Sequence, residues 1–217
     1  MAAFDLFKLS FLLNLLSTSN LNGWGGIRLA LSRVPAHIYD VVHTGNGFEI
    51  RRYNSSMWMT TKPIDDVSFV SATRTGFRQL FDYIQGKNDN QQKIEMTAPV
   101  ITEVTPSDGP FCASSFAVSF YVPKQNQQNP PSAKGLHLQK WGVTYVAVRQ
   151  FGGFLADEDV GEEAAALYAS VAGTVWSDAI EKSHAGDSAT DYIVAQYNSP
   201  FEFRNRVNEI WLTFDWE

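Results

Sequence analysis

Short runs of alternating apolar and polar residues recur along the chain and predict an antiparallel sheet. Phe116, Val118, Phe120 and Val122 alternate with smaller or polar residues, which is typical of a strand with one buried face. The segment YDVVHTGNGFEIRRY (residues 39–53) predicts two strands around a Thr-Gly-Asn-Gly turn, because Asn and Gly tolerate positive φ. Further strands are predicted over residues 57–63, 93–104, 138–154 (a strand pair with a turn at Trp141-Gly142), 192–198 and 208–214.

Apolar residues at helical spacing predict one helix in each half of the chain. The two sets are Phe77, Leu80, Phe81, Ile84 and Ala164, Leu167, Tyr168, Val171. Gly86 and Gly173 suit the ends of these helices, and residues 157–159 offer Asp side chains for the N-cap of the second. A Gln-, Asn- and Pro-rich surface loop is predicted over residues 123–135.

Each half of the chain therefore follows the order strand–strand–helix–strand–strand. Neither half is large enough to bury its core well alone. We predict an α+β fold in which two pseudo-repeated four-stranded sheets, each flanked by a helix, join as one eight-stranded antiparallel barrel. This domain is expected to span residues 37–217.

Residues 1–36 are predicted to be an N-terminal extension outside that domain. Its apolar stretch, residues 6–16, is too short to span a bilayer but suits a signal peptide of about residues 1–19, followed by a linker. A signal peptide would direct the chain to the secretory pathway or the extracellular space. An amphipathic or frayed extension, or a different start codon, would leave it cytoplasmic. The glycosylation sequon at Asn54 matters only in the first case.

Composition narrows the function classes. The chain has 217 residues, with 17 basic and 23 acidic side chains and a formal charge of −6, which disfavours binding to nucleic-acid phosphates. The single cysteine, Cys112, excludes an intrachain disulfide, and none of the four histidines has a zinc-ligand spacing. The sequence has no GxSxG, GxGxxG, P-loop or HExxH motif.

A few residues remain as candidates for chemistry. We interpret Glu95 and Glu209 as solvent-facing positions of strands, with a general acid or base in a pocket as the alternative. His43 and His137 are interpreted as surface residues, with axial metal ligation as the weaker alternative. Cys112 is interpreted as a small, partly buried hydrophobe.

The alternative to catalysis is ligand binding. Aromatic residues make up 13% of the chain, which is a high share. Most must fill the core, yet soft Met and flat aromatic side chains also suit a planar apolar ligand. The first half holds Phe48, Met57, Trp58, Met59, Phe77, Phe81, Ile94 and Met96, interspersed with Arg51, Arg52, Lys62, Arg74, Arg78 and Lys93. Basic residues would pair with peripheral carboxylates of such a ligand.

Several segments of the chain resemble the SOUL haem-binding protein family, most closely its plant members. They are GNGFEIRRY, GFRQLFDYIQGKN, KIEMTAPV, FAVSFYVP, YVAVRQFGGF and RVNEIWL, and the resemblance extends from about Val42 to Phe214. It implies a distorted β-barrel of two four-stranded sheets, each with a helix. It also implies one bound tetrapyrrole, haem or protoporphyrin IX, and no established catalytic activity.

The resemblance places the tetrapyrrole over the first helix. Arg74 matches a basic position there, and Phe77 and Phe81 match positions where animal members carry Met. A second basic position of the family matches Glu202 here, which weakens the carboxylate clamp unless Arg204 or Arg206 substitutes. No histidine aligns convincingly as an axial ligand. Together with residues of the aromatic, Met and basic pattern above, these matches give the predicted binding residues: Arg74, Phe77, Arg78, Phe81, Trp58, Met59, Met96 and Arg204.

Three functions remain open from the sequence. The first is a tetrapyrrole carrier, buffer or scavenger that uses a shallow hydrophobic site on the first helix, with no nucleic-acid partner and no membrane span. The second is an enzyme, such as a hydrolase, that acts on a tetrapyrrole or another flat hydrophobic molecule. The third is a protein-interaction module.

Overall fold

A computed structural model describes residues 39–106, 113–184, 190–198, 202 and 204–216. These residues belong to one unit of the chain, Val34–Glu217. The predicted N-terminal extension, its candidate signal peptide, the domain start at residue 37 and Cys112 lie outside the described residues and stay predictions. Asn54 is exposed between two strands.

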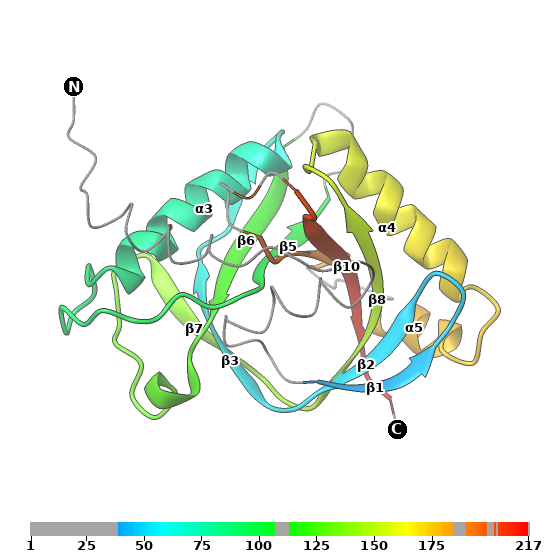
Figure 1. The fold of residues 1–217 in the computed structure, drawn as a ribbon, viewed down its shortest axis with the longest axis horizontal. Helices are drawn as coiled ribbons and strands as arrows, with labels where there is room; N and C mark the ends of the chain where they lie inside the picture. Colours follow the sequence, from blue (N-terminus) through cyan, green and yellow to red (C-terminus); the bar gives the residue numbers. More distant parts are fainter. Residues whose placement is uncertain (1–38, 107–112, 185–189, 199–201, 203, 217) are drawn as a thin grey trace. The chain divides into compact units, whose positions relative to one another are not determined.

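The described residues form an α+β fold in which one curled antiparallel sheet carries three α-helices (Figure 1). The helices are α3 (Phe69–Ile84), α4 (Asp157–Val171) and α5 (Ser177–His184). The strands are β1 (Tyr39–Thr44), β2 (Glu49–Tyr53), β3 (Ser56–Thr61), β4 (Ile64–Asp66), β5 (Val100–Thr105), β6 (Ser114–Tyr121), β7 (Leu136–Trp141), β8 (Thr144–Gly152), β9 (Tyr192–Gln196) and β10 (Val207–Phe214). None of these helices is long and apolar enough to cross a bilayer.

The predicted fold class and the two main helices are confirmed. The described strands number ten rather than eight, and they share one sheet in the order β1-β2-β8-β10-β9-β5-β6-β3-β7, with β4 on β6. The segment of residues 93–97, expected to begin a strand, is irregular, and β5 starts only at Val100 after a cis Ala98–Pro99 bond. The loop over residues 123–135 is present and contains a short 3-10 turn, Lys124–Asn126.

The strand pair predicted over residues 138–154 is wrong, because β7 and β8 do not fold back on each other. β7 pairs with β3, whereas β8 pairs with β2 and β10. One constant antiparallel register runs from Thr61↔Leu136 through Ser56↔Trp141 and Tyr53↔Thr144 to Glu49↔Val148. Both segments, β2–β3 and β7–β8, therefore continue across a two-residue link instead of turning back. Together they form one long two-stranded ribbon that connects the two halves of the sheet.

The sheet has two unlike faces. On the outer face, α3 packs mainly on β6 while α4 and α5 pack on β8 and β10. Apolar side chains of these helices pack against those of the outer face in two clusters. A third cluster contains strand and strand-end residues only, including Trp58, Tyr53 and Trp211, which point away from the helices. We call this second surface the inner face.

The N-termini of the two main helices are joined by a hydrogen bond. The Val70 backbone N–H donates to Asp157 Oδ1 at 2.9 Å, and the Ser71 N–H donates to the Ser68 hydroxyl at 3.1 Å. Asp157, the first residue of α4, thus accepts a hydrogen bond from the first turn of α3. Asp159 accepts one from the Ala156 N–H at 2.8 Å, at the start of α4 itself. Such bonds satisfy backbone donors that a helix start leaves open.

A glycine sets how closely α3 approaches the sheet. A Cβ atom at Gly76 would lie 2.6 Å from Val118 Cβ on β6. Gly76→Ala should lower the free energy of unfolding by about 1–3 kcal/mol through overpacking, measured by urea denaturation. Gly161→Ala in α4 is the matched control, since no atom lies within 4 Å of that site, and it should be neutral or stabilise by up to about 1 kcal/mol. Equal effects of the two variants would contradict the close packing.

Candidate functional site

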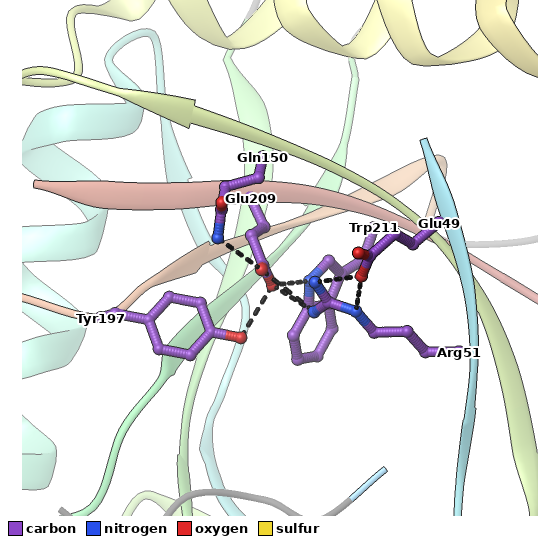
Figure 2. Close-up of polar contacts among 6 residues, drawn as sticks. All are labelled: Glu49, Arg51, Gln150, Tyr197, Glu209 and Trp211. Atoms are coloured by element: carbon purple, nitrogen blue, oxygen red, sulfur yellow. Dashed lines mark hydrogen bonds and ion pairs between the residues drawn. The ribbon is translucent and has the colours of Figure 1, made fainter. Parts of the chain in front are cut away.

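A buried ion pair lies at the centre of the inner face (Figure 2). Arg51 Nη1 on β2 lies 3.0 Å from both carboxylate oxygens of Glu209 on β10, and the two residues are 4% and 2% exposed. Arg51 also donates to Glu49 Oε2 at 2.9 Å, and its guanidinium lies 4.3 Å from the centre of the Tyr39 ring. Burial lowers the pKa of Arg51, but Glu209 and neighbouring tyrosines raise it more, so the guanidinium stays charged.

The Glu209 carboxylate is fully provided with donors. Tyr197 Oη and Trp211 Nε1 each donate to Oε2 at 2.7 Å, and Gln150 Nε2 lies 3.4 Å from Oε1 (Figure 2). Burial and the adjacent carboxylate raise the pKa of Tyr197 well above its usual range, so its hydroxyl remains a donor. The interpretation of Glu209 as a solvent-facing position is wrong. Because its oxygens are occupied by partners, the geometry describes a structural anchor.

The predicted binding residues of the first helix form a different surface, on the outer face. Arg74, Phe77, Arg78 and Phe81 follow one another at i, i+3, i+4 and i+7 and so lie on one side of α3. Both arginines are exposed and both phenylalanines are half-buried. The Phe77 and Phe81 rings are stacked, with centroids 5.9 Å apart and planes at 15°, and Phe77 meets the edge of Phe120 at 5.4 Å.

This helix side continues into other half-buried apolar residues. They pack on the same cluster, which includes the buried side chain of Met59, and are Met57, Met96, Ala133, Leu136 and Leu138. We call these five, together with Arg74, Phe77, Arg78 and Phe81, the α3 surface. Lys140 borders it, because it is exposed, lies opposite Met57 in the β3–β7 ladder and points to the same face as Leu138. The sequence analysis missed Lys140, although its spacing of two from Leu138 was the available signal.

Other predicted residues lie elsewhere. Trp58 is 0% exposed and points to the inner face, where its indole N–H donates to the Ser56 hydroxyl at 3.0 Å, so the structure separates it from Phe77 and Phe81. Arg204 is exposed between β9 and β10. Its place in a binding site stays a prediction.

The remaining candidates for chemistry are exposed. His43 lies on β1 beside the rings of Phe48 and Trp176, and His137 lies on β7. Glu95 is exposed in the irregular segment before β5. Across the part of the chain that the structure describes, no three His, Cys, Asp or Glu side chains gather into a metal-binding set.

The sequence profile of the family described as SOUL heme-binding protein matches residues 34–213, which is most of the chain. This chain belongs to the SOUL haem-binding protein family. Heme-binding protein 2 of Homo sapiens is 35% identical over 169 residues, which cover 76% of this chain and 77% of that protein. Heme-binding protein 2 of Mus musculus is 32% identical and covers 80% of both chains. Heme-binding protein 1 of Sus scrofa is 30% identical, over 71% of this chain and 75% of that protein.

Solved structures add information about the fold alone. The C-terminal domain of EcmrR superposes with a TM-score of 0.53 at 9% identity, covering 82% of this chain and 98% of that domain. EcmrR in its DNA complex superposes with a TM-score of 0.55 at 7% identity, covering 88% of this chain and 63% of EcmrR. At 7–9% identity, these superpositions show only that the strands and helices of this SOUL family member are arranged as in EcmrR.

Neighbouring arginines on β2 provide a test of the buried ion pair. Arg51→Met leaves the Glu209 charge buried without its cation and should lower the free energy of unfolding by about 3–5 kcal/mol. Arg52→Met is the matched control, because Arg52 pairs with Asp40 at the exposed surface, and its loss should cost under about 1 kcal/mol. Urea denaturation at neutral pH measures both.

The double variant Arg51→Met/Glu209→Gln removes the stranded charge and should recover part of the loss. If Arg51→Met and Arg52→Met destabilise equally, the inner face does not depend on the ion pair.

Proposed function

We propose that this protein binds a tetrapyrrole, haem or protoporphyrin IX, reversibly on the α3 surface and serves as its carrier, buffer or scavenger. The observation that carries the proposal is the stacked, half-buried Phe77–Phe81 pair beside the exposed side chains of Arg74 and Arg78 on the same side of α3. Relatives that are 30–35% identical bear the name heme-binding protein, which supports the ligand class.

The α3 surface has the two kinds of contact that a tetrapyrrole needs. Flat aromatic rings and Met side chains match the apolar face of the macrocycle, and contact with it removes apolar area from water. Arginine pairs with carboxylates through two parallel hydrogen bonds, so Arg74 and Arg78 would bind the peripheral carboxylates. Lys140 adds a third positive charge at the β7 border. This arrangement is distinctive because the whole chain carries a net negative charge of −6.

Binding without catalysis suits the residues around this surface. Haem, when bound, supplies an iron whose reactivity depends on its axial ligands. Of the described histidines, His43 lies on β1 and His184 on α5, and His137 alternates with Leu136 and Leu138 on β7, so its side chain points to the other side of the sheet from the α3 surface. The chain's own contribution is therefore apolar contact and charge pairing, which supports a carrier in place of an enzyme.

Hemin titration tests the proposal. The wild-type protein should give a saturable shift of the Soret band, because the chromophore leaves water for an apolar surface. Phe77→Asp should weaken binding by about 10- to 100-fold, the loss expected when the contact of one aromatic side chain is removed. Arg74→Glu should weaken it by roughly 3- to 10-fold through one lost ion pair at an exposed site.

Matched controls keep each change specific. Phe154→Asp replaces an exposed phenylalanine and Lys182→Glu reverses an exposed charge on α5, and both should bind hemin like the wild type. Phe81→Ala is a milder second change in case Phe77→Asp unfolds, which circular dichroism would reveal. A folded wild-type protein with no saturable response, or equal loss in the controls, would refute the proposed site.

A further inference from the structure

A hollow of about 280 Å³ lies within the inner face, on the side of the sheet away from the helices. Side chains of five strands and of one residue before β9 line it: Glu103, Gln139, Trp141, Thr144, Thr190, Ile193 and Thr213. Its location separates it from the α3 surface, because Ile193 and Trp141 belong to the helix-free cluster. We call it the inner hollow.

One carboxylate in the inner hollow, that of Glu103, has fewer hydrogen-bond donors than its two oxygens can accept. Glu103 is the only charged side chain among its described lining residues. Its Oε2 accepts a bond from the Thr190 hydroxyl at 3.3 Å, whereas its buried Oε1 has no donor in full hydrogen-bond geometry within the described part of the chain, the side-chain amide of Gln139 being the nearby polar group. Burial raises the pKa of Glu103, and the polar groups of Gln139 and Thr190 and the charge of His137 lower it only in part. A buried carboxylate oxygen without a donor is costly, which points to a donor supplied from outside.

The two carboxylates of the inner face make this contrast clear. Glu209 receives hydrogen bonds from Arg51, Tyr197 and Trp211 and so needs no further partner. Glu103 has no Arg or Lys opposite it among the described residues that line the hollow. Both glutamates point to the same side of the sheet, and Glu103 lines the hollow whereas Glu209 does not.

The rest of the lining specifies the body of the ligand. Trp141 offers a half-buried indole, and a cation near the face of an indole is attracted by its π electrons. Ile193 supplies an apolar wall, and the threonine hydroxyls can bond polar groups at the edge. The volume is just below the range of pockets for drug-sized ligands. We propose that the inner hollow binds a small organic cation whose ammonium group pairs with Glu103 and whose apolar body contacts Trp141 and Ile193.

This site would reject the carboxylates that the α3 surface attracts. A tetrapyrrole bears peripheral negative charge, and Glu103 would repel it. The two sites therefore select ligands of opposite charge, and one can be lost without the other.

Three probes of one skeleton test the proposal: protonated phenethylamine, neutral 2-phenylethanol and anionic 3-phenylpropanoate. The readout is the indole N–H signal of Trp141 in ¹⁵N NMR spectra, assigned by its disappearance in Trp141→Phe. Phenethylamine should shift this signal saturably, 2-phenylethanol should bind at least about tenfold more weakly, and 3-phenylpropanoate should not bind. Equal responses to the three probes, or no saturable shift, would overturn the proposal.

Glu103→Gln keeps the shape of the side chain and removes the charge, so it should weaken phenethylamine binding by about tenfold or more. The matched control is Glu158→Gln on the exposed side of α4, which should leave binding unchanged. Glu103→Gln should still bind hemin like the wild type, so failure here is distinct from failure of the α3 site. Unchanged phenethylamine affinity in Glu103→Gln would refute the role of Glu103.

Discussion

The ion pair between Arg51 and Glu209 is the contact on which the enclosed inner face depends. Two charges removed from water are tolerated only when each finds its partner and further hydrogen bonds. Here the two meet across the inside of the curled sheet, and Glu49, Tyr197 and Trp211 supply the additional bonds. The pair joins β2, which belongs to the long ribbon, to β10, which belongs to the half of the sheet that carries α4. It therefore adds a side-chain link between two strands that do not pair directly, across the intervening β8, on the inner side of the sheet.

The curled sheet gives the protein two chemically unlike surfaces. The outer face is covered by helices (Figure 1), and α3 presents two aromatic rings beside two arginines. The inner face is lined by aromatic and polar side chains and by carboxylates, one of which is paired and one of which opens on a hollow. Membership of the SOUL family supports a tetrapyrrole as the ligand, and the α3 surface is the site that we propose for it. The inner hollow is lined by the carboxylate of Glu103 instead of arginines, so the ligand proposed for it is a cation.

Much of this structure could be predicted from local pattern, because period and turn chemistry are local properties. The helix predicted from Phe77, Leu80, Phe81 and Ile84 is present as Phe69–Ile84, and Gly86 follows its end with a φ of 102°. The link between β7 and β8 could not be predicted in the same way. Alternation is equally compatible with a hairpin and with a strand that continues past Trp141 to pair with a distant segment.

The environment of the buried polar residues could be predicted only in part from the sequence. Alternation places Glu209 and Trp211 on one side of β10 and Ile210 and Leu212 on the other, but it does not reveal that both sides are buried, one within the curled sheet and the other under the helices. Alternation alone therefore predicts a solvent-facing Glu209, whereas the residue is buried. Trp58 illustrates a signal that was present: it is adjacent to Met59 in a strand, so the two must point to opposite faces. The hollow at Glu103 depends on residues far apart in the sequence and could not be predicted from any one segment.

The most direct measurement of the central claim is residue-by-residue NMR line broadening by hemin, whose paramagnetic iron broadens nearby signals. The backbone amides from Arg74 to Phe81 and those of Leu136 to Lys140 should broaden first at low hemin ratios. The indole signals of Trp211 and Trp58 on the inner face should stay sharp. Broadening centred on those indoles, with the α3 amides unaffected, would contradict a tetrapyrrole site on the α3 surface.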